Sequence, residues 1–487
     1  MEKYRDKIVD IVVIPFILLL AFIFMFESPL NMFESSGTCS TDSSVFKTVG
    51  FYMQNGYMPY RDIFDHKGPL IYIYNYLGNM ISYWRGIWLI ELISLSVTFY
   101  FMFQIAHIFC GRILSFFIVL GGASSLFPYF RYGNYTEEYA LPFIAIALYI
   151  FIDYFAIGKT NKIRLIFCGL SFGAVCMLRI NMISTWIIFC IAILLECIKE
   201  KKYKQLLYFI EYFMAGVLLI VIPIFLWLMG NHAFGDFIND YIVFNLKYTS
   251  VDWYEKFFSF MNFFNNKWVL STMAITILLL YKKRNILFTT YLFYYLLTLI
   301  MISISGREYS HYGMILVPMF IFPIASLVSL FWKQGSDKAI IAIGLYILSV
   351  NIMPVWLEKT ENVVNLYKNR TEEQSDVTQE TASYVVANTS KEDLITVWGN
   401  WDIIYARSQR FSASKYSYQS TIGADPVRMD EYFEEIEKNL PMYIIIQPEM
   451  EMGRMEQFIR EHKYILEREI EGALVYGLQK EKFEEKN

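Results

Sequence analysis

The run IVDIVVIPFILLLAFIFMF at residues 8–26 carries one charged side chain, Asp10, and is otherwise apolar. As an α-helix it is long enough to cross a hydrocarbon core of about 30 Å. It is too long for the apolar segment of a signal peptide, and no small-residue cleavage site follows it, so we expect a retained anchor. A membrane protein is therefore the first expectation.

The same apolar character continues along the whole chain. Of its 487 residues 56% are hydrophobic and 18% are charged, with 42 Phe and 37 Tyr, and the mean hydropathy is +0.36. This composition predicts a polytopic α-helical membrane protein with about eleven transmembrane helices. The expected spans are 8–26, 87–108, 112–128, 137–157, 163–180, 182–197, 206–229, 268–281, 286–304, 312–331 and 339–356.

Basic residues gather in alternate connections between these spans. Clusters at 3–7, 159–164, 199–204 and 282–284 fall on one side if the spans alternate in direction. Cytoplasmic loops are enriched in Lys and Arg. We therefore expect a multi-pass protein of the cell membrane with a cytoplasmic N-terminus and, after an odd number of spans, an extracytoplasmic C-terminus.

The outer connections contain moderately apolar pieces that are too polar to span a membrane. The loop 27–86 holds two of them, 44–56 and 69–84, and the loop 230–267 holds DFINDYIVFNLKY. Each piece interleaves apolar and polar residues, as helices lying in the membrane interface do. We predict a transmembrane catalytic module at 1–358, with interfacial helices in the outer loop 27–86.

From about residue 359 the composition becomes more charged, and short β-type runs alternate with amphipathic stretches. This pattern predicts a small extracytoplasmic α/β domain at 359–487. The expected strands are 393–399, 442–447, 464–470 and 473–479, and the expected helices are 372–388, 428–440 and 455–462.

The stretch PYRDIFDHKGPLIYIY at 59–74 is a dense group of opposite charges between apolar runs. Charges at a membrane surface are costly unless they are paired or functional. The other outer connections add ionisable residues to the same surface, so the sequence predicts a polar site there. Its candidate members are Asp42, Arg61, Asp62, Asp65, His66, Lys67, Arg131, Glu137, Glu138, Arg307 and His311.

Transfer of a group from a phosphate-linked lipid needs this mixture of charges. Cations hold the negative charge that develops on the leaving phosphate, and Lys67, Arg131, Arg307 and a protonated His311 are the candidates. A carboxylate takes the proton of the acceptor hydroxyl. Asp42 is best placed for this role because a short loop ties it to the first span, although an acid at this point could also be only a helix N-cap.

The other residues also have structural alternatives. Asp62 and Asp65 could form a salt-bridged turn that ends at Gly-Pro. Glu137 and Glu138 stand at a helix start, where acids favour the helix dipole. His311, in an aromatic setting, could be a hydrogen-bonded interfacial histidine. The six cysteines show no metal-ligand spacing and no disulfide framework.

Four segments resemble the polytopic glycosyltransferases of the GT-C type, especially the bacterial group related to the dolichyl-phosphate-mannose protein mannosyltransferases and the aminoarabinose lipid A transferase. They are TDSSVFKTVGFYMQNGYMPYRDIFDHKGPLIY (41–72), GNYTEEYALP (133–142), GREYSHYGMILVP (306–318) and VWGNWDIIYARSQRFSASKYSY (397–418). The resemblance implies a polyprenyl-phosphate sugar donor and a catalytic acid in the first outer loop. That loop often carries an Asp-Glu pair in the family, and here the position reads Asp42-Ser43.

We therefore expect an inverting glycosyltransferase with Asp42 as the base and the other candidate residues in substrate binding. The acceptor would be a lipid, polysaccharide or protein of the cell envelope, with membrane lipid around the chain, no nucleic acid and no metal or other cofactor. A lipid-linked sugar transporter or flippase is the alternative, but such proteins place ionisable residues in mid-span. A membrane-anchored binding protein would leave residues 59–74 unexplained.

Overall fold

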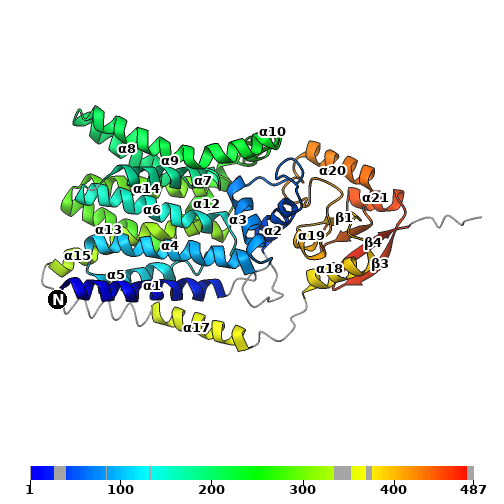
Figure 1. The fold of residues 1–487 in the computed structure, drawn as a ribbon, viewed down its shortest axis with the longest axis horizontal. Helices are drawn as coiled ribbons and strands as arrows, with labels where there is room; N and C mark the ends of the chain where they lie inside the picture. The colour runs from blue at the N-terminus through cyan, green and yellow to red at the C-terminus, as the bar shows by residue number, and fades with distance from the viewer. Residues whose placement is uncertain are drawn as a thin grey trace, which may run out of the picture.

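The computed structural model describes residues 2–26, 40–83, 85–130, 133–158, 160–333, 352–368 and 376–479. Long helices run side by side along one direction, and a small sheet with its own helices lies at one end of them (Figure 1). Two shorter helices, α2 (Thr41–Gln54) and α3 (Pro69–Ile81), lie between the long helices and the sheet (Figure 1).

The long helices follow the predicted apolar runs. In chain order they are α1 (Glu2–Phe26), α4 (Arg85–Phe109), α5 (Arg112–Ser124), α6 (Thr136–Ile157), α7 (Lys162–Cys176), α8 (Ser184–Lys199), α9 (Tyr203–Gly230), α13 (Lys267–Lys283), α14 (Ile286–Ile302) and α15 (Ile321–Lys333). Shorter elements join them: η1 (Ile180–Met182), α10 (Phe234–Phe237), the π-helix η2 (Ile238–Val243), α11 (Phe244–Tyr248), α12 (Trp253–Phe264), the 3₁₀-helix η3 (Ser310–Phe320) and α17 (Met353–Lys368).

By length and composition, four helices of the described residues can cross a membrane: Arg85–Phe109, Thr136–Ile157, Tyr203–Gly230 and Ser310–Trp332. The bent pair α12 and α13 adds a fifth if it is one span. Most of the predicted span 339–356 lies outside the described residues, so the number eleven stays a prediction.

Side-chain caps fix where several helices begin. Asn161, Asn266 and Asn285 accept hydrogen bonds from backbone N–H groups in the first turns of α7, α13 and α14. Each cap satisfies a donor that the helix cannot pair internally. The predicted starts of these three helices lie within a few residues of the observed starts, because each start is set by a local cap.

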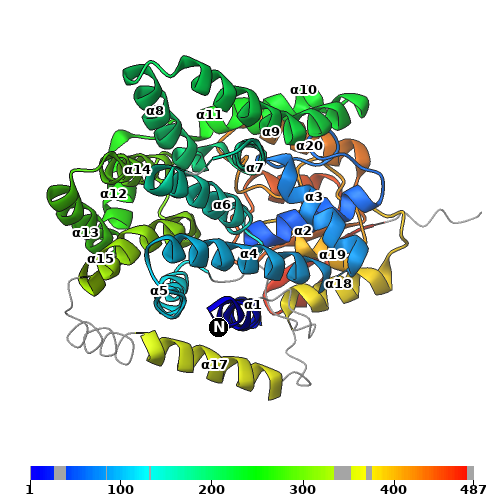
Figure 2. The same cartoon turned by 60° about the vertical axis from the view of Figure 1, so that its left-hand side comes forward.

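Glycines let α7 and α9 approach closely. A Cβ at Gly169 would lie 1.9 Å from the carbonyl oxygen of Phe213, and one at Gly216 would lie 2.0 Å from that of Ile166. Small residues of this kind allow the backbones of membrane helices to touch. Figure 2 shows α9 along one flank of the bundle, with α12, α13 and α14 on another.

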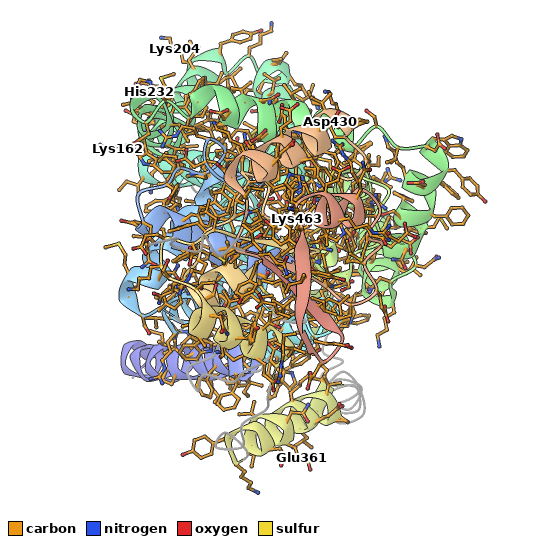
Figure 3. The ribbon with its side chains drawn as sticks, turned by 90° about the vertical axis from the view of Figure 1, so that its right-hand side faces the viewer. Lys162, Lys204, His232, Glu361, Asp430 and Lys463 are labelled. Carbon is orange, nitrogen blue, oxygen red and sulfur yellow. The ribbon has the colours of Figure 1, made fainter. Side chains whose placement is uncertain are left out.

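The C-terminal elements form a four-stranded sheet in the order β1-β2-β4-β3. Strands β1 (Ile395–Trp398) and β2 (Tyr443–Ile446) are parallel, and β4 (Ala473–Leu478) pairs antiparallel with β2 and with β3 (Tyr464–Ile470). Seen end-on, Lys463 and Asp430 of this part face the viewer, and Glu361 on α17 lies apart from it (Figure 3). The accompanying helices are α18 (Val377–Asn388), α19 (Ile403–Ser408), α20 (Pro426–Asn439) and α21 (Arg454–Glu461).

Helix α2 is enclosed by protein. The interfacial helix predicted at 44–56 would instead leave one face open. Its residues 43–52 are all buried. The hydroxyl of Thr48 donates to the carbonyl oxygen of Asp402 at 2.7 Å, and Ser44 Oγ accepts from the Ile403 amide at 3.1 Å. Helix α3 keeps an open apolar end at Met80 and Ile81.

Candidate functional site

Asp42 lies in the first turn of α2, and its carboxylate is not the helix cap. Ser40 is the N-cap, and its hydroxyl oxygen accepts a hydrogen bond from the Ser43 amide at 3.2 Å. The Asp42 side chain is 33% exposed, and its Oδ2 lies 3.8 Å from His311 Nε2. The carboxylate is therefore available for contacts outside its own helix.

The segment Asp65–Lys67 brings a buried cation close to this carboxylate. Asp65 accepts hydrogen bonds from the hydroxyl groups of Tyr72 and Tyr418, each at 2.8 Å, and from the His66 amide at 2.7 Å. Lys67 Nζ lies 2.7 Å from His66 Nε2. The hydrogen bonds of Asp65 thus fix the segment 65–67, and the contact with His66 holds the Lys67 side chain.

Electrostatic interactions across the site keep Asp42 and Lys67 charged. Burial by itself raises the pKa of Asp42, but the nearby charges of Lys67, of His311 when it is protonated, and of Arg179 have the larger opposite effect, so this pKa lies below the usual value. Burial lowers the pKa of Lys67, but Asp42 and Asp65 raise it above the usual value. Burial and the Lys67 charge hold the pKa of His66 well below the usual value, so His66 is neutral and accepts from Lys67.

Arg179 is a member of the site that the sequence did not single out. It forms an ion pair with Glu137, and its guanidinium carbon lies 4.2 Å from the centre of the Tyr312 ring. Glu137 also accepts from the Thr136 hydroxyl at 2.8 Å. Arg179 stands at the end of a predicted span, where a charge is easily taken for a residue at the membrane edge. The free-energy cost of placing a charge near a membrane span was nevertheless a signal that could have singled it out.

His311 joins the site through stacked rings. Its imidazole stacks on Tyr135 with ring centres 4.5 Å apart and on Tyr309 at 5.7 Å. Tyr135 directly precedes α6, which carries Glu137. The structure therefore brings Asp42, Lys67, Glu137 and His311 together, as predicted.

Glu138 has a structural environment beside this group. Its Oε2 accepts from the Asn134 amide at 2.9 Å, and the same amide also donates to Glu91. The side-chain amide of Asn134 donates to Ser43 Oγ at 3.1 Å. These bonds join the starts of α2 and α6, so Glu138 fixes the geometry around Asp42.

Arg61 and Asp62 lie in a surface turn. Two hydrogen bonds of 2.7 and 2.8 Å join the two side chains, and Arg61 donates to the Asn231 carbonyl at 2.7 Å. Asp62 also accepts from the Met58 amide at 2.7 Å. Their contacts match the salt-bridged turn, and none of these contacts reaches Asp42.

Arg307, another predicted cation, is not among the charges that act on Asp42. Arg307 is exposed, and its guanidinium carbon lies 6.0 Å from the centre of the Tyr248 ring, which itself packs edge-on to His66. Arg131 lies outside the described residues.

A second charged group joins the loop 230–267 to the C-terminal part. Asp240 in the π-helix η2 is buried, and its carboxylate lies 2.7 Å from Arg428 and 3.3 Å from Lys415. These residues are far apart in the chain, and no local pattern links them. Within the described ranges, no three His, Cys, Asp or Glu side chains are grouped to hold a metal ion.

Comparison with known proteins shows likeness in structure only. No family model matches the chain, and no curated protein matches it significantly. ArnT from Cupriavidus metallidurans bound to undecaprenyl phosphate aligns over 97% of this chain and 98% of its own, with a TM-score of 0.64 and 10% identity. AglB from Archaeoglobus fulgidus, an oligosaccharyltransferase in complex with an inhibitory peptide and a dolichol-phosphate, aligns over 98% of this chain and 75% of its own. Its TM-score is 0.54 at 11% identity.

An oligosaccharyltransferase from Archaeoglobus fulgidus in complex with zinc and sulfate aligns with a TM-score of 0.50 at 10% identity, over 96% of this chain and 73% of its own. ArnT and AglB are both GT-C membrane glycosyltransferases. At these identities the likeness shows the fold, and it confirms the GT-C fold and the multi-pass membrane architecture predicted from the sequence.

Proposed function

Because the chain has the GT-C fold, we propose that it is an inverting glycosyltransferase that moves a sugar from a polyprenyl-phosphate donor to an envelope acceptor. One observation carries the proposal: Asp42 lies beside His311 and within the field of the cations Lys67 and Arg179. A base next to a phosphate-binding cluster is the arrangement that the transfer requires. The ligands of the two structural neighbours, undecaprenyl phosphate and dolichol-phosphate, support a donor of this class.

The proposed reaction needs one proton transfer and one substitution. The acceptor hydroxyl gives its proton to Asp42 while its oxygen attacks the anomeric carbon of the sugar. A bond forms between that oxygen and the anomeric carbon, and the bond from this carbon to the phosphate oxygen breaks. The electron pair stays on the polyprenyl phosphate, and attack from the face opposite the phosphate inverts the configuration.

We propose that two of the cations hold the donor phosphate directly. Lys67 and Arg179 would hold the leaving phosphate, since both are electrostatically coupled to Asp42. Arg307 and Arg131 would approach from the outer loops. Asp65 and His66 would position Lys67, and Glu137 would position Arg179 through their ion pair.

We place the reaction on the outer face of the cell membrane, with a lipid, polysaccharide or protein of the envelope as the acceptor. The basic clusters at 159–164, 199–204 and 282–284 support an orientation that leaves Asp42 outside.

The test uses the full chain in lipid nanodiscs with a polyprenyl-phosphate sugar and an envelope extract as acceptor. We expect free polyprenyl phosphate to form, together with a mass increase of one sugar on a component of the extract. A flippase would move the intact donor between leaflets without cleaving it. Intact donor after incubation with every common sugar and extract would contradict the proposal.

A further inference from the structure

Helix α12 has an exposed face made of large aromatic side chains. The exposed fractions of Trp253, Tyr254, Phe257 and Phe258 are 73%, 59%, 45% and 46%. Positions four residues apart share a face of an α-helix and adjacent positions lie about 100° apart, so these four side chains fall within an arc of about 140°. Water would have to solvate four aromatic rings in one contiguous patch, which favours an apolar partner.

The other two sides of α12 have different characters. Ser259 and Phe263 are buried against the protein. Glu255 and Asn262 are exposed and lie between the buried side and the aromatic side at the helical spacing of 3.6 residues. A helix with a protein side, an apolar side and a polar side is the pattern of a helix lying along a membrane surface.

The geometry of the neighbouring helix agrees with this position. Helix α12 meets α13 at a bend of 75°. Helix α13 exposes Leu270, Ile277 and Leu278, as a lipid-facing helix does. If α13 runs across the bilayer, α12 runs nearly parallel to its surface, and both lie on the same flank of the molecule (Figure 2).

The charges on α12 indicate how it would bind. The segment 252–264 carries Asp252, Glu255 and Lys256 as its only charged side chains. A net negative segment has no attraction for anionic headgroups. Trp and Tyr favour the boundary between headgroups and acyl chains, so the aromatic side chains would supply the binding.

We propose that α12 docks on the lipid leaflet on the side of Asp42, with its four aromatic side chains inserted at the headgroup boundary. The docked helix would also hold the loop before η3, because Ser259 Oγ donates to the Arg307 carbonyl at 2.7 Å and a Cβ at Gly306 would lie 2.9 Å from Glu255 Cβ. The loop leads to His311, so this second effect rests on the proposed function, whereas docking itself does not.

Quenching of Trp253 tests the docking without any assay of activity. The full chain is reconstituted in phosphatidylcholine vesicles with and without bromine on the acyl chains near the headgroup. The fluorescence of Trp253 is obtained as the difference between the parent and Trp253→Phe. We expect brominated lipid to quench this signal by about twofold or more, whereas the same difference for Trp398→Phe, a residue of β1, should not be quenched.

Matched variants on the two exposed sides of α12 separate insertion from mere proximity. Phe257→Glu should shift the Trp253 emission to longer wavelength and remove its quenching. Asn262→Glu, on the polar side of the same helix, should leave both unchanged. Replacing a third of the lipid by phosphatidylglycerol should not strengthen the quenching.

Two outcomes would overturn the inference. The first is Trp253 fluorescence that brominated lipid does not quench in the parent. The second is shielding that appears only at high protein density in the vesicles, which would assign the aromatic side of α12 to a second copy of the chain.

Discussion

At the scale of single residues, Ser40 and Asp42 divide two tasks that one acid at a helix start could perform. Ser40 supplies the cap of α2, and Asp42 faces His311. Asp42→Asn should therefore lower turnover by about 10²–10⁴-fold with little change in Tm or in donor affinity, as measured by release of polyprenyl phosphate and by thermal unfolding. Ser40→Ala is the matched control, and it should cost about 1 kcal/mol of stability with a much smaller loss of turnover. A folded Asp42→Asn variant that turns over at the rate of the parent would show that Asp42 is not the base.

Asp402 should make stability depend on pH. It is fully buried, and burial, assisted by the Asp65 charge and opposed by the hydrogen bond from Ser417, raises its pKa to about 7. Between about pH 4 and 7 the folded chain holds a proton here that the unfolded chain releases, so this stability is complete below pH 4 and is lost as pH rises towards 7. Over this pH range the proton on Asp402 changes the free energy of unfolding by at most roughly 4 kcal/mol. Asp402→Asn should raise Tm at pH 8 and flatten the change between pH 5 and pH 8, and an unchanged pH profile would show that Asp402 does not titrate in this range.

At the scale of elements, the joint between η2 and α20 is a charged link between the membrane part and the C-terminal part. A π-helix adds a residue to a helical turn, and η2 carries the buried Asp240 that meets Arg428 and Lys415. The phenyl ring of Phe64 lies 4.6 Å below the Arg428 guanidinium, so the joint also touches the segment that leads to Asp65.

Removing Arg428 should loosen this joint. A buried charge left without any partner costs about 3–5 kcal/mol. Because Lys415 still faces Asp240, Arg428→Ala should cost less than this, but it should lower Tm and speed hydrogen exchange in η2 and α20. Arg454→Ala breaks an ion pair with Asp430 whose side chains are 51% and 62% exposed, and such pairs contribute at most about 1 kcal/mol. Equal effects of the two substitutions would show that Asp240 does not depend on Arg428.

At the scale of the whole molecule, the sequence predicted many of the elements that depend on local pattern, but not helix α12 or the 3₁₀ form of η3. Apolar runs gave the helix positions, and the predicted strand 464–470 coincides with β3. Helix α2 shows where this reasoning ends. Its segment interleaves apolar and polar residues, and the polar Ser44, Lys47 and Thr48 bond to Ile403, Asn79 and the Asp402 carbonyl. Distant partners of this kind cannot be inferred from spacing. Arg179 was overlooked for another reason, because it stands at the end of a predicted span.

The orientation in the membrane is the prediction that belongs to this largest scale. In a Cys39→Ser background, Ser383→Cys on α18 should react with an impermeant thiol reagent in intact cells, because residues 376–479 are proposed to lie outside. Lys204→Cys at the start of α9 is exposed in the structure and should react only after permeabilisation. The background labelling comes from the five described cysteines, which are buried or partly buried: Cys110, Cys168, Cys176, Cys190 and Cys197. The reverse pattern would place Asp42 in the cytoplasm.

The hydrogen bond from Tyr418 to Asp65 spans 353 positions of the chain, and the Phe64 amide donates to the Lys415 carbonyl at 2.9 Å. During translation, the segment that presents Lys67 is made early and its partners are made near the end. Contacts between such distant residues also form slowly. A nascent chain with every membrane helix already inserted therefore still lacks the support of Lys67, the lysine proposed to bind the donor phosphate, and under that proposal a product of premature termination before residue 415 would be inert towards the lipid donor. On the proposed function, activity would therefore begin only after the segment 415–418 has packed onto the membrane part.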